Sequence, residues 1–137
     1  VMGSWVNLGA DTNGSDLKNN YGSVRVDLGQ GSEDSGSSFV GPHLGDHAKT
    51  GIDTMLTTGG VVGVAANVFG GGFAPRHGPA FGWGGAEGRS EYRLDAAIET
   101  AATVFARRGA RWTDAHAALL RAEFVATAEQ RAAAGLA

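Results

Sequence analysis

A six-residue repeat between residues 44 and 70 constrains the fold of this chain more than any other feature. The first residue of each six-residue unit, which we call its lead, is aliphatic in four of five cases: Leu44, Thr50, Leu56, Val62 and Val68. The residues after these leads are Gly45, Gly51, Thr57, Gly63 and Phe69, and small residues follow four places after the first four leads, at Ala48, Thr54, Gly60 and Ala66. Helices repeat about every 3.6 residues and strands about every second residue, so neither explains this period.

A repeat of this kind is typical of a chain that winds into coils with flat sides and tight corners. Each unit would form one short strand with its lead residue pointing inward, and glycine or small residues would permit the corner. The opening segment repeats the pattern at Met2 and Leu8. We therefore expect parallel β-helical coils over residues 1–70. A Gly-rich loop region with apolar residues at coincidental spacing is the alternative interpretation.

The remaining segments follow other patterns. Residues 13–38 interrupt the repeat and are expected to form an inserted loop, with one further strand at 23–28 and a polar, mobile loop at 29–38. Residues 71–90 are rich in Gly and aromatic residues and are interpreted as a connection that covers the open end of the coils. Residues 91–137 are expected to form C-terminal helices. Apolar side chains there follow helical spacing, Gly109 supplies a stop and Thr113 an N-cap.

Composition excludes several classes of function. The net charge of −3 gives no reason to expect a nucleic-acid partner, whose binders carry a basic face, and Arg107-Arg108 is the one adjacent basic pair. No apolar run reaches the length of a membrane span. The chain has no cysteine, so it forms no disulfide and no thiolate metal site. We expect a cytoplasmic protein with no membrane partner.

Particular stretches carry a resemblance to a known family: GSWVNLGADT (3–12), SDLKNNYG (15–22), GDHAKT (45–50), VVGVAANVFG (61–70) and FGWGG (81–85). The chain resembles the C-terminal portion of sugar nucleotidyltransferases that carry a hexapeptide-repeat domain. That family is similar to the bifunctional enzyme of UDP-N-acetylglucosamine synthesis, a uridylyltransferase joined to a glucosamine-1-phosphate acetyltransferase. The resemblance implies a left-handed parallel β-helix followed by a C-terminal α-helical cap, mainly β overall, and a homotrimer packed side by side.

The resemblance also implies a binding site between subunits. In the bifunctional enzyme, an Asn-x-Gly-Ala strand contacts the sugar phosphate and the acyl-CoA co-substrate, and a following Asn-Tyr pair completes the pocket. The matching residues here are Asn7, Ala10, Asn20 and Tyr21, and Arg25 corresponds to a basic residue further on. Two positions depart from the pattern: Pro42 replaces a serine and offers neither hydroxyl nor N–H, and Asp11 stands where the family usually has glycine.

The catalytic base that the resemblance implies is a histidine that would precede Val1. Any Mg²⁺ would belong to the nucleotidyltransferase half, further upstream still. On this interpretation the chain by itself is inactive, because acyl transfer needs a base. His47 is an alternative candidate for the base. His43 and His47 around Asp46 also suggest a metal site, but residues four apart do not share a face in six-residue coils, so we expect no metal.

Two functions therefore remain open at this point. The first is acyl-CoA-dependent transfer to an amino-sugar phosphate or a nucleotide sugar, which Asn7, Asn20 and Tyr21 favour. The second is a non-catalytic module that trimerises a sugar nucleotidyltransferase, which Pro42 and Asp11 favour.

Overall fold

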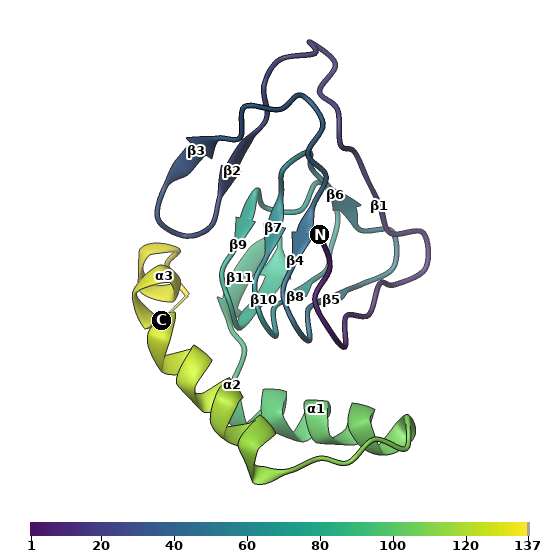
Figure 1. Ribbon diagram of the computed structural model, residues 1–137, viewed down its shortest axis with the longest axis vertical. Helices are drawn as coiled ribbons and strands as arrows, with labels where there is room; N and C mark the ends of the chain where they lie inside the picture. The colour runs from purple at the N-terminus through teal and green to yellow at the C-terminus, as the bar shows by residue number, and fades with distance from the viewer. Residues whose placement is uncertain (137) are drawn as a thin grey trace.

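A computed structural model describes residues 1–136 and places a stack of short strands against three C-terminal helices (Figure 1). The strands are β1 Asn13–Gly14, β2 Arg25–Asp27, β3 Ser32–Asp34, β4 His43–Leu44, β5 Lys49–Thr50, β6 Met55–Leu56, β7 Val61–Val62, β8 Asn67–Val68, β9 His77–Gly78, β10 Gly82–Gly85 and β11 Gly88–Glu91. The helices are α1 Leu94–Arg107, α2 Asp114–Ala126 and α3 Ala128–Ala133. The helices of 14, 13 and 6 residues together hold about as many residues as the strands of two to four, so the expected parallel strands and C-terminal helices are present but the chain is not mainly β by residue count.

The strands of the repeat pair in parallel, as the six-residue period predicts. Strands β4, β7 and β9 form one sheet, β5, β8 and β10 a second, and β1 pairs with β6 in a third. His43 pairs with Val61 and Lys49 with Asn67, so these partners lie three repeats apart. Each strand is thus followed by strands of two other sheets before the chain returns to the first. The left-handed sense of this winding stays a prediction.

The predicted lead residues form the core of the stack. Leu44, Thr50, Leu56, Val62 and Val68 are all buried, together with the small residues Ala48 and Ala66. The glycine after a lead permits close approach of the next coil: a Cβ on Gly45 would lie 2.7 Å from the backbone nitrogen of Val64. Any larger residue at this position would push the coils apart, which explains the aliphatic–glycine pairs in the sequence.

The corners differ from the sequence-based expectation that small residues permit them. Three places after most leads stands a residue with positive φ, and most of these residues are not glycine: Trp5, Asp11, His47, Asp53, Gly59 and Ala65. Phe81 has the same backbone conformation three places after Gly78 of β9. Positive φ costs an ordinary L-residue about 1–2 kcal/mol. Asp and His tolerate this region better than most residues, whereas Ala65 and Phe81 are buried in a cluster with the helices. Packing therefore stabilises some corners whose sequence gives no turn signal.

The insertion is more ordered than the sequence indicates. Residues 13–14 form β1 and belong to the stack, so the insertion begins after them. The strand expected at 23–28 is present as β2, and it pairs antiparallel with β3, so the expectation of a mobile loop at 29–38 is wrong where β3 forms. Figure 1 shows this hairpin beside α3, and a Cβ on Gly29 would meet the Gln130 side chain.

Residues 71–90 are also not a simple connection. Strand β9 pairs in parallel with β7, and Trp83 of β10 pairs in parallel with Asn67, so these strands continue two sheets of the stack. Strand β11 then runs antiparallel to β10 and leads directly to the helices. The paired residues Val61 and His77, like Asn67 and Trp83, are not separated by a multiple of six, which is why the repeat alone does not reveal these strands.

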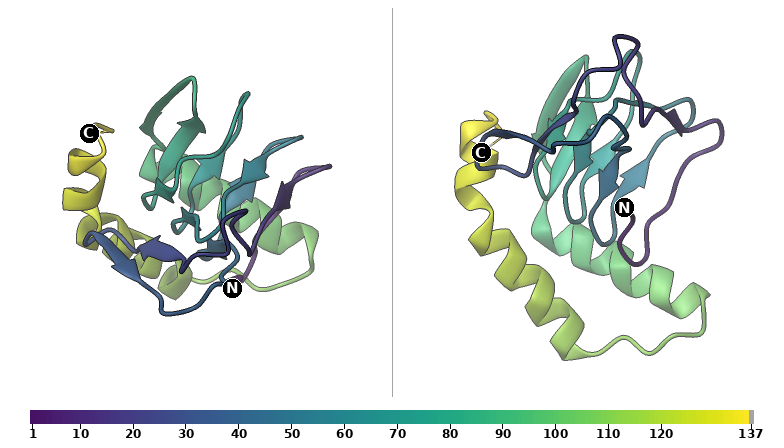
Figure 2. Two further views of the ribbon diagram at one scale, coloured as in Figure 1. Left: turned by 90° about the horizontal axis from the view of Figure 1, so that it is seen from above. Right: turned by 45° about the horizontal axis from the view of Figure 1, so that its top comes forward.

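The corners of successive coils lie above one another in rows. Helix α1 runs along one of these rows, which we call the corner row (Figure 2). Its buried face consists of Ala97, Ala101 and Phe105 at helical spacing. The two alanines belong to a cluster with Ala65 and Phe81, and the Phe105 ring stacks on Trp5 with 4.0 Å between centroids. The helix thus runs from the last coil back to the first and ends beside residues 5–7.

Candidate functional site

A cleft of about 610 Å³ lies where the end of α1 meets the first coil. Its lining consists of Trp5, Val6, Asn7, Lys49, Val104, Arg107 and Arg108. The first four come from the stack and the last three from α1 or the residue after it. Stacking of Phe105 on Trp5 holds the two sides of the cleft together.

The strand register places the polar residues of the cleft in one row. Asn7 bridges to Lys49 in parallel, and Lys49 pairs with Asn67 on the next coil. Each of these residues immediately precedes an inward lead, so its side chain points to the outside of the stack. A ligand in the cleft would therefore meet the outer surface of the first two coils.

The Asn7 amide differs from the side chains at equivalent positions. Asn13 donates to the carbonyl of Asp11 at 3.1 Å, Lys49 to that of His47 at 2.9 Å, and Asn67 to that of Ala65 at 3.1 Å. In each case the acceptor is the corner residue two places earlier. Within residues 1–136 the Asn7 side chain makes no such hydrogen bond, so its amide is available to a ligand.

The lining of the cleft is positively charged. Lys49, Arg107 and Arg108 carry three cationic groups, and none of the described lining residues is acidic. Burial holds the pKa of Lys49 below its usual value. The ion pairs among residues 1–136 are Arg131–Glu91 and Arg121–Asp95, so neither neutralises the cations of the cleft.

The structure does not gather the other predicted site residues around Asn7. Asn20 accepts a hydrogen bond from the Gly22 N–H within its own loop, and the side chain of Tyr21 is 74% exposed. Arg25 donates to Ser32 across the β2–β3 hairpin. Ala10 contributes its backbone carbonyl to Asp53. Within one chain, these four residues lie outside the lining of the cleft.

His47 lies at a corner between the stack and the helices. It is 8% exposed, and its ring is 6.1 Å from that of Phe105 and 6.5 Å from that of Trp5. Burial, reinforced by the charge of Lys49, lowers its pKa, although Asp46 opposes this. It lines a separate cavity of about 140 Å³ with Asp46, His116 and Glu123. In residues 1–136, no three side chains of the kinds that bind metals are grouped to hold an ion.

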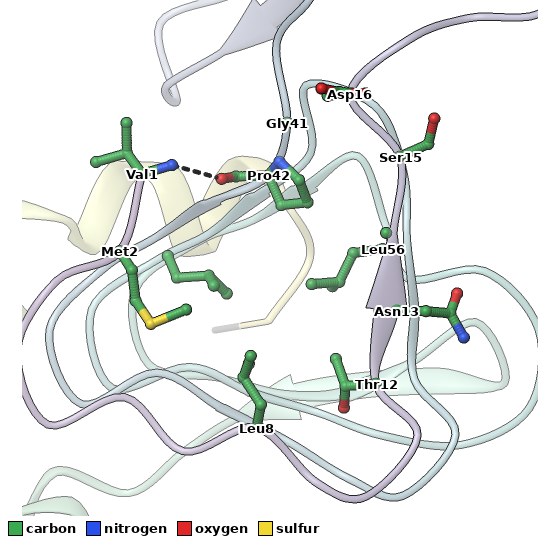
Figure 3. Close-up of a pocket in the computed structure, with 12 residues that line it drawn as sticks. Val1, Met2, Leu8, Thr12, Asn13, Ser15, Asp16, Gly41, Pro42 and Leu56 are labelled. Carbon is green, nitrogen blue, oxygen red and sulfur yellow. Dashed lines mark hydrogen bonds between the residues drawn. The ribbon is translucent and has the colours of Figure 1, made fainter.

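A third cavity, of about 400 Å³, opens at the first coil (Figure 3). Met2, Leu8 and Leu56 point into it, so it is the uncovered end of the apolar core. Pro42 at its rim accepts a hydrogen bond from the Val1 amino group through its carbonyl. The lining offers mostly apolar contacts and lacks the cations of the cleft beside α1.

Comparison with known proteins does not assign a function to the site. No family model, curated protein or solved structure matches this chain. None of the helices in residues 1–136 combines the length and the apolar character that crossing a bilayer requires. The functional argument therefore depends on the geometry of the cleft itself.

Of the residues that the family resemblance assigns to the site, Asn7 lines the cleft, and the contribution of α1 was missed. The adjacent pair Arg107-Arg108 was a signal in the sequence, but nothing there placed it beside a strand about a hundred residues earlier. Lys49 stood in the GDHAKT stretch with no indication that it faces the same space.

Proposed function

We propose that this chain is a hexapeptide-repeat domain of a sugar-phosphate nucleotidyltransferase/acyltransferase, wound as a left-handed β-helix. Its function is acyl-CoA-dependent transfer to an amino-sugar phosphate at a subunit interface. The observation that carries the proposal is the Asn7 amide, which faces a basic cleft and has no internal partner among the described residues. Asn7 is also one of the residues to which the family resemblance assigns substrate contact.

The chemistry of the cleft suits binding and orientation. In acyl transfer, the sugar amine attacks the thioester carbonyl, a C–N bond forms, the C–S bond breaks, and the proton of the amine ends on the CoA thiolate. An amide such as Asn7 can donate to a sugar hydroxyl or an acyl carbonyl. The lining residues include no imidazole and no carboxylate. In this proposal the base therefore comes from a neighbouring subunit or from other parts of a longer protein.

Trimer formation would complete the site. Other parts of the stack carry exposed apolar residues, such as Ile52 and Phe73. Exposed apolar side chains of this kind favour side-by-side packing of subunits. In a trimer packed in this way, Asn20 and Tyr21 of one subunit would lie at the cleft of another.

The same apolar sides favour the second candidate function, a non-catalytic trimerisation module. Such a module needs the packing surface but no ligand. Sedimentation equilibrium tests the trimer, and ligand titration separates the two functions.

The test is calorimetric titration of the chain with acetyl-CoA and with glucosamine-1-phosphate. We expect Asn7→Ala to weaken binding of at least one ligand by about three- to tenfold, the value of one hydrogen bond. Asn13→Ala is the matched control, because Asn13 holds the equivalent position on the next sheet and bonds internally. A wild-type trimer that binds neither ligand would leave the trimerisation module as the function.

A further inference from the structure

We propose that Lys49, Arg107 and Arg108 form a phosphate-ester site at the end of α1. This inference rests on the proposed function for the identity of the ligand. It adds that these three cations bind the phosphate group of that ligand. The phosphate comes either from the amino-sugar phosphate or from CoA. It would lie between β5 and the C-terminal turn of α1, within reach of Asn7.

The cations come from independent elements, so helix electrostatics does not explain all of them. Basic residues at the end of a helix interact favourably with its dipole, which accounts for Arg107 and Arg108. It does not account for Lys49, a strand residue far away in the sequence. Convergence of all three on one space that has no acidic lining residue points to an anionic ligand.

Lys49 is kept in a partly buried position at an energetic cost. Burial lowers its pKa, which means that its environment disfavours the charged form. Its ammonium has three donors, and within residues 1–136 it makes one hydrogen bond, to the His47 carbonyl at 2.9 Å. A phosphate would accept from a remaining donor and offset the burial of the charge.

The structure also holds the two sides of the site in place. Phe105 lies two residues before Arg107, and its ring stacks on Trp5, which itself lines the cleft. The backbone from which both arginines extend is thus anchored to the first coil. Arginine guanidinium groups match phosphate geometry with two parallel hydrogen bonds, which a single lysine does not provide.

The experiment titrates the trimeric or monomeric chain, as it occurs in solution, with four ligand probes and with inorganic phosphate. Glucosamine-1-phosphate is compared with glucosamine, and CoA with 3′-dephospho-CoA. The variants are Lys49→Met and the double change Arg107→Ala with Arg108→Ala. The control is Arg93→Ala with Arg121→Ala, which also removes two positive charges, but at exposed positions outside the cleft. Circular dichroism and urea midpoints verify folding of each variant.

We expect both cleft variants to weaken binding of the phosphorylated ligand by about tenfold or more, and the control by less than about twofold. Inorganic phosphate should compete with that ligand, and added NaCl should weaken its binding. The phosphate comes from the ligand whose counterpart without that phosphate, glucosamine or 3′-dephospho-CoA, binds the cleft variants and the wild type equally well.

The proposal would be wrong if the variant with Arg107→Ala and Arg108→Ala bound the phosphorylated ligand as tightly as the control variant does. If Asn7→Ala still weakens binding in that case, the proposed function stands and only the phosphate assignment falls. If wild type binds none of the phosphorylated probes, both proposals fall.

Discussion

The Nε atom of Arg131 lies 2.8 Å from a carboxylate oxygen of Glu91, and this pair joins α3 to the end of β11. Arg131 is 2% exposed, whereas the Glu91 side chain is 32% exposed. The guanidinium also donates to the Thr127 hydroxyl and the Phe124 carbonyl, and it lies 3.8 Å from the centre of the Phe124 ring. A buried cation with all these partners fixes the last helix on the stack.

Glu91→Gln should therefore destabilise the protein, because the buried guanidinium would lose its counter-ion. We expect a loss of about 1–3 kcal/mol in the free energy of unfolding, less than for a fully buried pair because Glu91 is partly solvated. Urea denaturation followed by circular dichroism measures it. Asp95→Asn is the control, since Asp95 pairs with Arg121 at 3.8 Å on the exposed surface. That change should cost less than about 0.5 kcal/mol. Equal losses for both variants would contradict the assigned role of Arg131.

Removal of the Phe105 ring should loosen α1 from the first coil. Phe105 is buried and contacts the rings of Trp5, Trp112 and His116. We expect Phe105→Ala to cost about 3–5 kcal/mol. Tryptophan fluorescence should shift as Trp5 and Trp112 gain solvent. Leu119→Ala, an exposed α2 position, is the control. Unchanged fluorescence in Phe105→Ala would show that α1 does not depend on this stacking.

The backbone of Asp53 offers a test of the corner geometry. Its φ is +57°, and its side chain is exposed, so a substitution there acts mainly through the backbone. We expect Asp53→Val to destabilise by about 1–2 kcal/mol, because a β-branched residue resists positive φ. Asp53→Gly should be neutral or stabilising by up to about 1 kcal/mol. Thermal denaturation compares the two. A glycine variant less stable than the valine variant would argue against the corner conformation.

Acid should weaken the folded state through its histidines. Burial lowers the pKa of His43 and of His77, which lie on β4 and β9, the two strands that flank β7. The unfolded chain, whose histidines titrate at about pH 6.5, therefore binds protons that the folded chain does not. The contribution to stability is complete above about pH 6.5 and falls as the pH drops below it. Urea midpoints at about pH 7.5 and pH 5.5 measure this window, which lies above the range where carboxyl groups titrate. The double change His43→Gln with His77→Gln should flatten the dependence. Stability that rises on acidification would contradict it.

Lys49→Met should separate stability from binding. Burial disfavours the charged ammonium, so an apolar side chain of similar length should leave the free energy of unfolding unchanged or raise it by up to about 1 kcal/mol. Phosphate binding should fall in the same variant. Urea denaturation without ligand measures the first effect. A loss of stability above about 1 kcal/mol would mean that Lys49 is mainly structural, through its bond to the His47 carbonyl.

Local patterns in the sequence were enough to predict the elements whose cause is local. The aliphatic leads from Leu44 to Val68 are buried because an inward position repeats with every strand, whereas Met2 and Leu8 of the first coil are exposed. The helix from Leu94 and the Thr113 cap follow from spacing and side-chain chemistry. The β2–β3 hairpin and β9–β11 were missed or misassigned. Their strands are held by partners and packing outside the six-residue period.

The site depended on the tertiary structure. Asn13 and Asn67 look equivalent to Asn7 in the repeat, and only the fold shows that they bond to the preceding corner whereas Asn7 faces a cleft. Arg107 and Lys49 line the same cleft because α1 runs back along the corner row, where the Phe105 ring stacks on Trp5. The sequence by itself determined the repeat and the helices, since these arise from neighbours along the chain. Packing between distant residues decided which polar groups share a cleft, and no spacing along the chain encodes that.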